Sequence, residues 1–245
     1  MLLAIDIGNT TIGLAVMTPK GVVRSVSVID TNSKAEKIKT VVAGILKHDR
    51  IAKAVICSVV PQACTRLENI LKKRVPVFVI GRDILVPIKN GYKYPKQVGQ
   101  DRLVGAFAAM KIYGPPLIVV DLGTATTFDV VSPKGEYLGG AIVPGLRLSA
   151  ESLFLKTALL PRTEIKPPRH IIGKTTQESI QSGLFYGYGS LCRGLIDLLN
   201  QKLKTSCQVV MTGGYARLMK GFVSPKMCKV DENLVFKGIY FCSSG

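Results

Sequence analysis

The chain has 245 residues, 47% of them hydrophobic, and its 33 Lys and Arg against 16 Asp and Glu give a formal net charge of +17. This composition is that of a folded protein and excludes a disordered chain. No apolar stretch approaches the roughly 20 residues that span a bilayer, and residues 1–5 lack the basic start of a secretory signal. We therefore expect a cytoplasmic protein of one or two domains that neither enters a membrane nor is secreted.

The first half of the chain contains short predicted strands followed by alternating helices and strands. Three strands separated by tight turns are predicted at residues 2–6, 11–17 and 22–29. Apolar spacing then predicts helix 34–47, strand 55–58, helix 64–73, strand 75–80 and helix 103–113.

The second half begins with the same pattern, with strands predicted at 117–121, 126–132 and 136–143. A long helix is predicted over Thr176–Leu203, although it contains four glycines. Its apolar residues exceed what one face of a small domain needs, and this favours a homodimer: they are Leu184, Phe185, Leu191, Leu195 and Leu198.

An internal repeat relates the two halves. Residues 4–11 resemble residues 120–127, and Asp6 and Asp121 lie 115 residues apart. Each segment is followed by a Pro-Lys-Gly turn, at residues 19–21 and 133–135. We therefore expect an α/β protein with two related domains, residues 1–115 and 116–245, each a mixed sheet flanked by helices. The cleft between such domains is the expected ligand site.

The turn after the first strand reads Asp6-Ile7-Gly8-Asn9-Thr10-Thr11. Backbone N–H groups and hydroxyls gathered there suit a phosphate, and Asp6 is placed to hold Mg²⁺ directly or through water. A side chain at Gly8 would block close approach of the backbone to that ligand. The alternative is an ordinary hairpin turn, since Gly and Asn favour such turns.

A second turn of this kind reads Asp121-Leu122-Gly123-Thr124-Ala125-Thr126-Thr127. Paired Asp-x-Gly turns at the start of duplicated domains resemble the superfamily of actin, sugar kinases, acetate kinase and the large heat-shock chaperones. The resemblance implies two ribonuclease H-like, actin-like ATPase domains. A Walker A loop is absent from the sequence.

A third motif, Gly99-Gln100-Asp101-Arg102, precedes an apolar helix. Asp101 alone could be a helix N-cap, and the Asp–Arg pair could equally supply a proton acceptor and an anion-binding group. Together with both turns and the run Gly139–Gly145, this motif makes the chain resemble type III pantothenate kinases. The resemblance covers essentially the whole chain in order, including Gly173–Thr176 and, more loosely, the adenosine-side glycine pair of Thr212–Gly214.

The resemblance implies that ATP phosphorylates the terminal hydroxyl of pantothenate, the first step toward coenzyme A, in a homodimer with the substrate site at the subunit interface. It implies Asp101 as general base, Mg²⁺ bound through the ATP phosphates, and a monovalent cation, potassium or ammonium, on Asp121. The implied ATP-binding residues are Asp6, Ile7, Gly8, Asn9, Thr10, Thr11, Ile12, Gly13 and Thr124. The implied pantothenate-binding residues are Tyr92, Gly99, Gln100, Asp101, Arg102 and Thr176.

Two other functions deserve comparison. A different kinase of the superfamily would need a sugar- or acetate-binding insertion that this short chain lacks. A transcriptional accessory factor without kinase activity draws some support from the charge of +17. No helix-turn-helix, RNA-binding aromatic motif or zinc finger accompanies that charge, so we expect a solvated basic surface and no nucleic-acid partner.

The six cysteines lack metal-ligand spacing, so we expect reduced, mostly buried thiols.

Overall fold

The computed structural model describes residues 1–223 and 228–244 and divides into two compact units. Unit 1 comprises Met1–Ile112 and Asn233–Gly245, and unit 2 comprises Tyr113–Glu232. The units therefore differ from the halves 1–115 and 116–245 at two points: unit 2 begins at Tyr113, and the C-terminal helix, α8 (Leu234–Ser243), belongs to unit 1.

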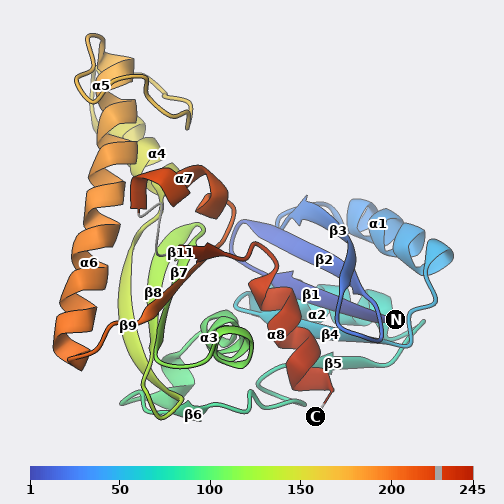
Figure 1. Cartoon of the computed structure of the whole chain (residues 1–245). Coiled ribbons are helices and arrows are strands. Elements are labelled where there is room, and N and C mark those ends of the chain that lie inside the picture. The colour runs from blue at the N-terminus through green and yellow to red at the C-terminus, as the bar shows by residue number, and fades with distance from the viewer. Residues whose placement is uncertain (224–227, 245) are drawn as a thin grey trace. The chain divides into compact units, whose positions relative to one another are not determined.

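Unit 1 is built on a five-stranded mixed sheet with the strand order β3-β2-β1-β4-β5 (Figure 1). Its strands are β1 (Leu2–Ile7), β2 (Thr11–Met17), β3 (Val23–Asp30), β4 (Lys53–Ser58) and β5 (Val77–Val79). The hairpin strands β1, β2 and β3 pair antiparallel, whereas β4 pairs parallel with both β1 and β5. The carboxyl ends of β1 and β4 consequently meet at one edge of the sheet, where Asp6 lies beside Cys57.

Side chains alternate along each strand, so the buried apolar residues of this sheet lie on both of its faces. Helices cover each face. Leu3 and Ile5 face the core shared with α1 (Ala35–His48) and α2 (Pro61–Leu71). Leu2 and Ala4 face the core shared with α3 (Gln100–Tyr113) and α8. The short elements β6 (Lys89–Asn90) and η1 (Pro95–Gln97) lie between β5 and α3 in the chain.

Unit 2 repeats the topology of unit 1 in the strand order β11-β10-β7-β8-β9. These strands are β7 (Leu117–Leu122), β8 (Ala125–Val131), β9 (Glu136–Pro144), β10 (Gln208–Thr212) and β11 (Cys228–Val230). Again the first three pair antiparallel, and β10 pairs parallel with both β7 and β11.

The repetition extends to single hydrogen bonds. The β2–β3 pair has a register shift at Val16/Met17, and the β8–β9 pair has one at Val130/Val131. Each Pro-Lys-Gly turn ends in a glycine at φ +76, whose N–H donates to the residue three positions before it. The Gly21 bond measures 3.0 Å and the Gly135 bond 2.9 Å. The expected α/β fold of two duplicated actin-like domains is thus confirmed.

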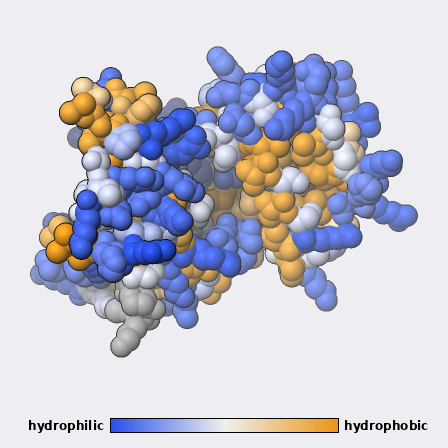
Figure 2. Space-filling model, turned by 90° about the horizontal axis from the view of Figure 1, so that it is seen from above, coloured by the Kyte–Doolittle hydropathy of each residue, from blue (hydrophilic) through white to orange (hydrophobic). Residues whose placement is uncertain are grey.

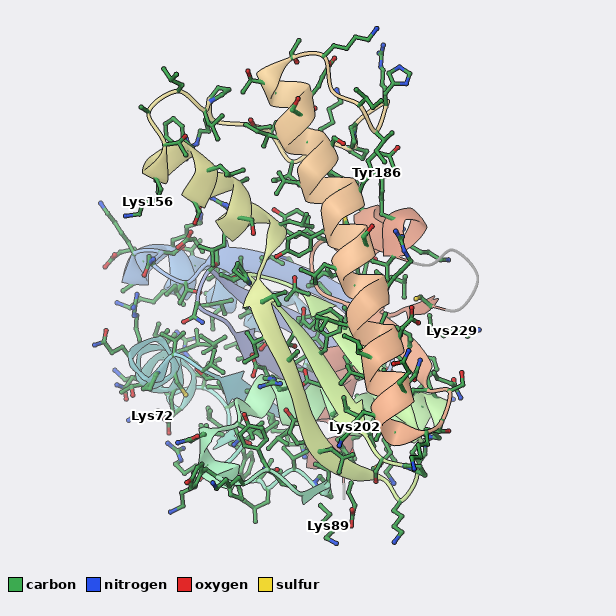
Figure 3. All side chains as sticks on the ribbon, turned by 90° about the vertical axis from the view of Figure 1, so that its left-hand side faces the viewer. Lys72, Lys89, Lys156, Tyr186, Lys202 and Lys229 are labelled. Atoms are coloured by element: carbon green, nitrogen blue, oxygen red, sulfur yellow. The ribbon has the colours of Figure 1, made fainter. Side chains whose placement is uncertain are left out.

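The long helical segment of unit 2 is one continuous rod in Figures 1 and 3. It consists of α5 (Thr176–Ser182), a π-helical turn η2 (Gly183–Gly187) and α6 (Tyr188–Leu203). Tyr186, labelled in Figure 3, lies in the π-helical turn, and Lys202 lies in the last turn of α6. The predicted helix is therefore present, with two of its glycines bounding the π-helical turn rather than ending the helix.

Several elements were not predicted from the sequence: α4 (Leu146–Lys156), β10, α7 (Ala216–Val223), β11 and α8. Strand β5 is also shorter than the predicted 75–80.

Within the described residues, no helix combines the length and the apolar character that crossing a membrane requires.

Candidate active site

The turn that joins β1 to β2 is held by the end of β3. The N–H of Gly8 donates to the carbonyl of Thr11 at 2.9 Å and closes the turn. Thr31, directly after β3, donates from Oγ1 to the carbonyl of Gly8 at 2.8 Å and from its N–H to the carbonyl of Thr10 at 3.0 Å. The loop expected to bind phosphate is therefore fixed from both sides before any ligand binds.

Glycine stands at positions 8 and 13 for different structural reasons. A Cβ at Gly8 would meet only the carbonyl oxygen of Thr11, at an ordinary 3.5 Å, so the packing of the protein itself does not require glycine there. A Cβ at Gly13 would lie 2.7 Å from the ring of Phe236 on α8. Glycine at position 13 is thus explained by helix packing, whereas the space at Gly8 is open to a ligand. The side chains of Ile7 and Ile12 are fully buried in the core, so only their backbone can face a phosphate.

Asp101 is the second residue of α3, and its carboxylate turns back over the start of the helix. Oδ1 accepts the N–H of Arg102 at 2.8 Å. A Cβ added at Gly99 would overlap the same Oδ1 and would touch Val59 at 3.4 Å. The carboxylate therefore occupies space that only glycine at position 99 leaves open. A carboxylate in the first turn is also stabilised in its ionised form by the helix dipole.

Asp6 and Asp101 both lie near the buried thiol of Cys57 on β4. Burial raises the pKa of Cys57 well above its ordinary value, and the negative charges of Asp6 and then Asp101 raise it further. A thiol in this environment stays protonated and is a poor nucleophile. The structure thus brings the predicted phosphate-binding carboxylate and the predicted base together within unit 1. No sequence signal pointed to Cys57 as their common neighbour.

The contact between Gly99 and Asp101 predicts a kinetic effect of Gly99→Ala. The new methyl group must displace the carboxylate, and a displacement of about 1 Å can lower turnover by up to about 10²-fold. The matched control is Gly105→Ala on the same helix, where an added Cβ meets no atom within 4 Å. Steady-state turnover and the thermal unfolding midpoint should show a slow, folded Gly99→Ala and a fully active Gly105→Ala. Equal turnover in both variants would show that the position of the carboxylate is unimportant.

The remaining predicted substrate residues of unit 1 lie before α3 or at its start. Tyr92 is half-buried, and its N–H donates to Oδ1 of Asn90 at 3.0 Å. Gln100 is the first residue of α3, and Arg102, the third, is half-buried. Arg102 and Asp101 are consecutive residues in the first turn of the helix.

The turn between β7 and β8 in unit 2 is held by Gly145. The N–H of Gly123 donates to the carbonyl of Ala125, and the N–H of Gly145 donates to the carbonyl of Thr124, both at 3.1 Å. A Cβ at Gly145 would overlap the carbonyl oxygens of Gly123 and Thr124. The predicted Gly139–Gly145 motif therefore ends in a glycine that allows the backbone before α4 to pack on this turn.

The carboxylate of Asp121 is bordered by glycine backbone. Gly213 has φ +87, and a Cβ there would overlap Oδ1 of Asp121. A Cβ at Gly123 would lie 3.4 Å from the same oxygen. Across residues 1–223 and 228–244 the structure shows no group of three His, Cys, Asp or Glu side chains able to hold a metal ion. A cation at Asp121 or Asp6 would therefore take most of its ligands from backbone, water or phosphate oxygens.

Thr176 begins α5, but it is not the residue that caps this helix. Thr175 accepts the N–H of Glu178 at 3.2 Å, and Glu178 accepts the N–H groups of Lys174 and Thr175 at 2.8 and 3.2 Å. This capping box leaves the exposed Thr176 without a role in starting the helix. In Figure 1 the helix α5 lies at the upper end of the rod, away from β7.

A cavity of about 550 Å³ lies in unit 2 beside the residue that follows the glycine pair. Tyr215 lines it, together with Arg147, Glu151, Arg162, Glu164 and other residues. The N–H of Tyr215 donates to the carbonyl of Leu122 at 3.2 Å, so this cavity borders the carboxyl end of β7.

Comparison with known sequences identifies one family. A family model described as type III pantothenate kinase matches residues 2–198. A type III pantothenate kinase of Persephonella marina is 42% identical over 250 residues, covering 98% of this chain and 97% of that protein. One from a Sulfurihydrogenibium species is 39% identical over 255 residues, covering 98% of each chain.

Comparison with solved structures shows the same fold at low sequence identity. A Campylobacter jejuni protein described as a conserved putative Baf family transcriptional activator has a TM-score of 0.61 at 19% identity, covering 98% of this chain and 96% of that one. A ROK family glucokinase of Streptomyces griseus with bound glucose and AMPPNP has a TM-score of 0.58 at 11% identity, covering 100% and 99%. At these identities the likeness concerns the fold alone.

Proposed function

The chain belongs to the type III pantothenate kinase family, and we propose that Asp101 is the general base of its reaction. The protein phosphorylates pantothenate with ATP to 4′-phosphopantothenate, the first step of coenzyme A biosynthesis. One observation carries the assignment of the site: Val59 donates its N–H to the carbonyl of Ile7, next to Asp6, at 3.1 Å, and its side chain lies 3.4 Å from where a Cβ at Gly99, beside the Asp101 carboxylate, would be. The groups needed for phosphate binding and for proton removal therefore lie in one region of unit 1.

Phosphoryl transfer proceeds through a loose transition state, so catalysis is mainly alignment and charge neutralisation. The hydroxyl of pantothenate loses its proton late in such a reaction, and a carboxylate without special activation can accept it. The helix start orients Asp101 for this role, because its carboxylate is held by the N–H of Arg102 and faces the space left by Gly99. Arg102, beside it, is our candidate for pairing with the carboxylate of pantothenate.

The β1–β2 turn is our candidate for the ATP phosphates. The residues present fit a phosphate and its divalent ion, because the space at Gly8 is open and Asp6 is the last residue but one of β1, near the end of the strand that leads into this turn. Mg²⁺ bound with ATP supplies neutralisation of the phosphate charge. Asp6 holds this ion in our assignment, while Thr31 keeps the backbone of Gly8 and Thr10 in place for the phosphates. Pantothenate is assigned to Tyr92, Gly99, Gln100, Asp101, Arg102 and Thr176.

We assign a monovalent cation to Asp121 and the nucleotide to its neighbours Thr124 and the Gly213–Gly214 pair. A carboxylate is a suitable ligand for such an ion, and the residues at positions 123 and 213 that border it carry no side chain to cover it. Such an ion supplies extra positive charge near the phosphates. The cavity bordered by Tyr215 is large enough for a nucleoside, within the range typical of ligand pockets. ATP use and six buried, free thiols favour a cytoplasmic enzyme.

We propose that the enzyme is a homodimer that associates through apolar surface of unit 2. Two residues expected at an interface, Leu184 and Phe185, are instead buried in the core of unit 2. Leu191 and Leu198 remain exposed along one face of α6. The chain around α4 and α5 exposes further large apolar residues: Leu155, Leu159, Ile171 and Ile172. Hydrophobic residues also reach the surface on the left-hand side of Figure 2. A surface of this kind marks an interaction site.

Light scattering should therefore report twice the 26.5 kDa of one chain at micromolar concentration. Leu159→Asp, at a position 91% exposed, should weaken the dimer, because a charge placed in an apolar interface is costly to desolvate. The matched control is Leu85→Asp in unit 1, at a position 77% exposed, which should leave the mass unchanged. A wild-type mass of one chain would refute the dimer.

The activity itself is tested by a coupled assay of ATP consumption with and without pantothenate, over a small panel of other alcohols. ATP use should depend on pantothenate and fall for the other alcohols. A DNA mobility shift run at several salt concentrations tests the accessory-factor alternative. Weakening that is linear in the logarithm of salt concentration, with no sequence preference, would indicate bulk electrostatics only.

A further inference from the structure

The turn that follows β5 is bound to α2 by a forked arginine. Arg82 donates from Nη1 and Nη2 to both carboxylate oxygens of Glu68 at 3.1 and 2.9 Å. It also donates from Nε and Nη2 to both oxygens of Asp83 at 3.0 and 2.9 Å. One guanidinium thus links a residue of α2 to a residue of the turn through two bidentate pairs. Hydrogen bonds from Arg82 lower the pKa of both carboxyl groups.

Asp83 passes this constraint to the backbone of the turn. Its Oδ2 accepts the N–H of Val79 at 2.8 Å, and its own N–H donates to the carbonyl of Val79 at 2.8 Å. The N–H of Gly81 donates to the carbonyl of Ile84, also at 2.8 Å. Ile80 joins the turn to β4 by donating to the carbonyl of Ile56 at 2.8 Å. The turn over residues 79–84 is therefore tied to α2 on one side and to β4 on the other.

The 79–84 turn also supports the start of α3. Gly81 has φ +87, and a Cβ there would lie 2.8 Å from Cδ and 3.1 Å from Cγ of Gln100. The side chain of Gln100 therefore packs directly on the backbone of Gly81, and any bulk at position 81 would displace it. Gln100 is the first residue of α3 and is bonded in the chain to Asp101. An unbroken series of contacts leads from Glu68 and Arg82 through Gly81 to the candidate base.

From these contacts we infer that Arg82 is a positioning residue for Asp101. It acts together with Glu68 and Asp83 by fixing the 79–84 turn on which the first residue of α3 packs. The inference rests on the proposed role of Asp101 as general base. Such positioning matters because a displacement of about 1 Å at a reacting group costs up to about 10²-fold in rate. The side chain of Arg82 is 54% exposed, so this role does not depend on burial in the core.

The test compares Arg82→Met with Arg24→Met. Arg24 is a matched control in the same unit: it is 56% exposed and pairs with Asp49 at 2.9 Å, but it lies on β3. Arg82→Met should lower kcat by about tenfold with the KM for ATP unchanged and the thermal midpoint equal to that of Arg24→Met. Arg24→Met should keep wild-type kcat. Equal kcat in the two variants would overturn the inference.

Arg82→Lys separates geometry from charge. Lys keeps the positive charge but lacks the planar fork that binds two carboxylates at once, so it should be nearly as slow as Arg82→Met. In a plot of kcat against pH, Arg82→Met should lower the plateau. It should not shift the pH at which kcat falls on the acid side. Full recovery in Arg82→Lys, or a shifted acid limb in Arg82→Met, would show an effect of charge and overturn the positioning role.

A double variant distinguishes failure of this inference from failure of the proposed base. If Arg82 acts through Asp101, adding Arg82→Met to Asp101→Asn should lower the residual turnover no further. A further tenfold loss in the double variant would mean that Arg82 acts elsewhere. If Asp101→Asn alone is fully active, the base assignment itself is wrong, whatever the effect of Arg82→Met.

Discussion

Asp101→Asn should lower the turnover of pantothenate phosphorylation by about 10²–10⁴-fold, the usual contribution of a general base. Asn is nearly the same size and retains Oδ1, so it can still accept the N–H of Arg102 that Asp101 accepts at 2.8 Å. It cannot take a proton from the substrate hydroxyl. The fold, the thermal midpoint and the affinity for ATP should therefore change little, while the rate of the chemical step should fall strongly.

The measurement is steady-state kcat, with ATP binding followed by calorimetry on the same samples. The alternative is that Asp101 is only a helix cap, and the structure gives this alternative a different expected result. It is the second residue of α3, and Asn satisfies the same backbone N–H, so a capping role predicts an active variant. Near-normal turnover in Asp101→Asn would place the base elsewhere. Tyr92→Phe serves as a comparison, because it removes a predicted substrate contact without removing a base.

Wild-type activity should fall strongly when potassium is replaced by sodium or by a bulky organic cation at constant ionic strength. ATP and a carboxylate substrate bring several negative charges together, and one additional cation reduces their repulsion as charge spreads in the transition state. Asp121 is our candidate ligand, because glycine backbone at positions 123 and 213 borders its carboxylate. Asp121→Asn should lose activity together with most of its response to potassium.

Asp197→Asn is the matched control, since Asp197 is an exposed residue of α6 in the same unit. It should keep both its activity and its potassium response. The competing explanation is that Asp121 merely orders its turn through nearby backbone N–H groups. That explanation predicts an Asp121→Asn variant that is slower but still responds to potassium as the wild type does. Equal wild-type rates in all salts would exclude the cation role and leave the kinase activity intact.

The repeat of Asp6 and Asp121, with its two Pro-Lys-Gly turns, was enough to predict the duplicated α/β fold from the sequence. Short-range signals were reliable here, because turn residues and alternating apolar residues act through neighbours in the chain. The long helix over Thr176–Leu203 was predicted for the same reason. The elements that were missed, among them β10, β11 and α8, are short and lie outside the segments whose sequences visibly repeat, residues 4–21 and 120–135.

The sequence by itself determined the family, the two Asp-x-Gly turns and the candidate base, because these features are local in the chain. Only the tertiary structure decided which residues surround them. It placed Asp6 and Asp101, 95 positions apart, near enough to one buried thiol of β4 for both charges to raise its pKa, and it packed Phe236 of α8 on Gly13. It also linked Glu68, Arg82 and Gly81 to the first residue of α3. Such contacts depend on strand register and helix packing between distant segments, and no local pattern of residues specifies them.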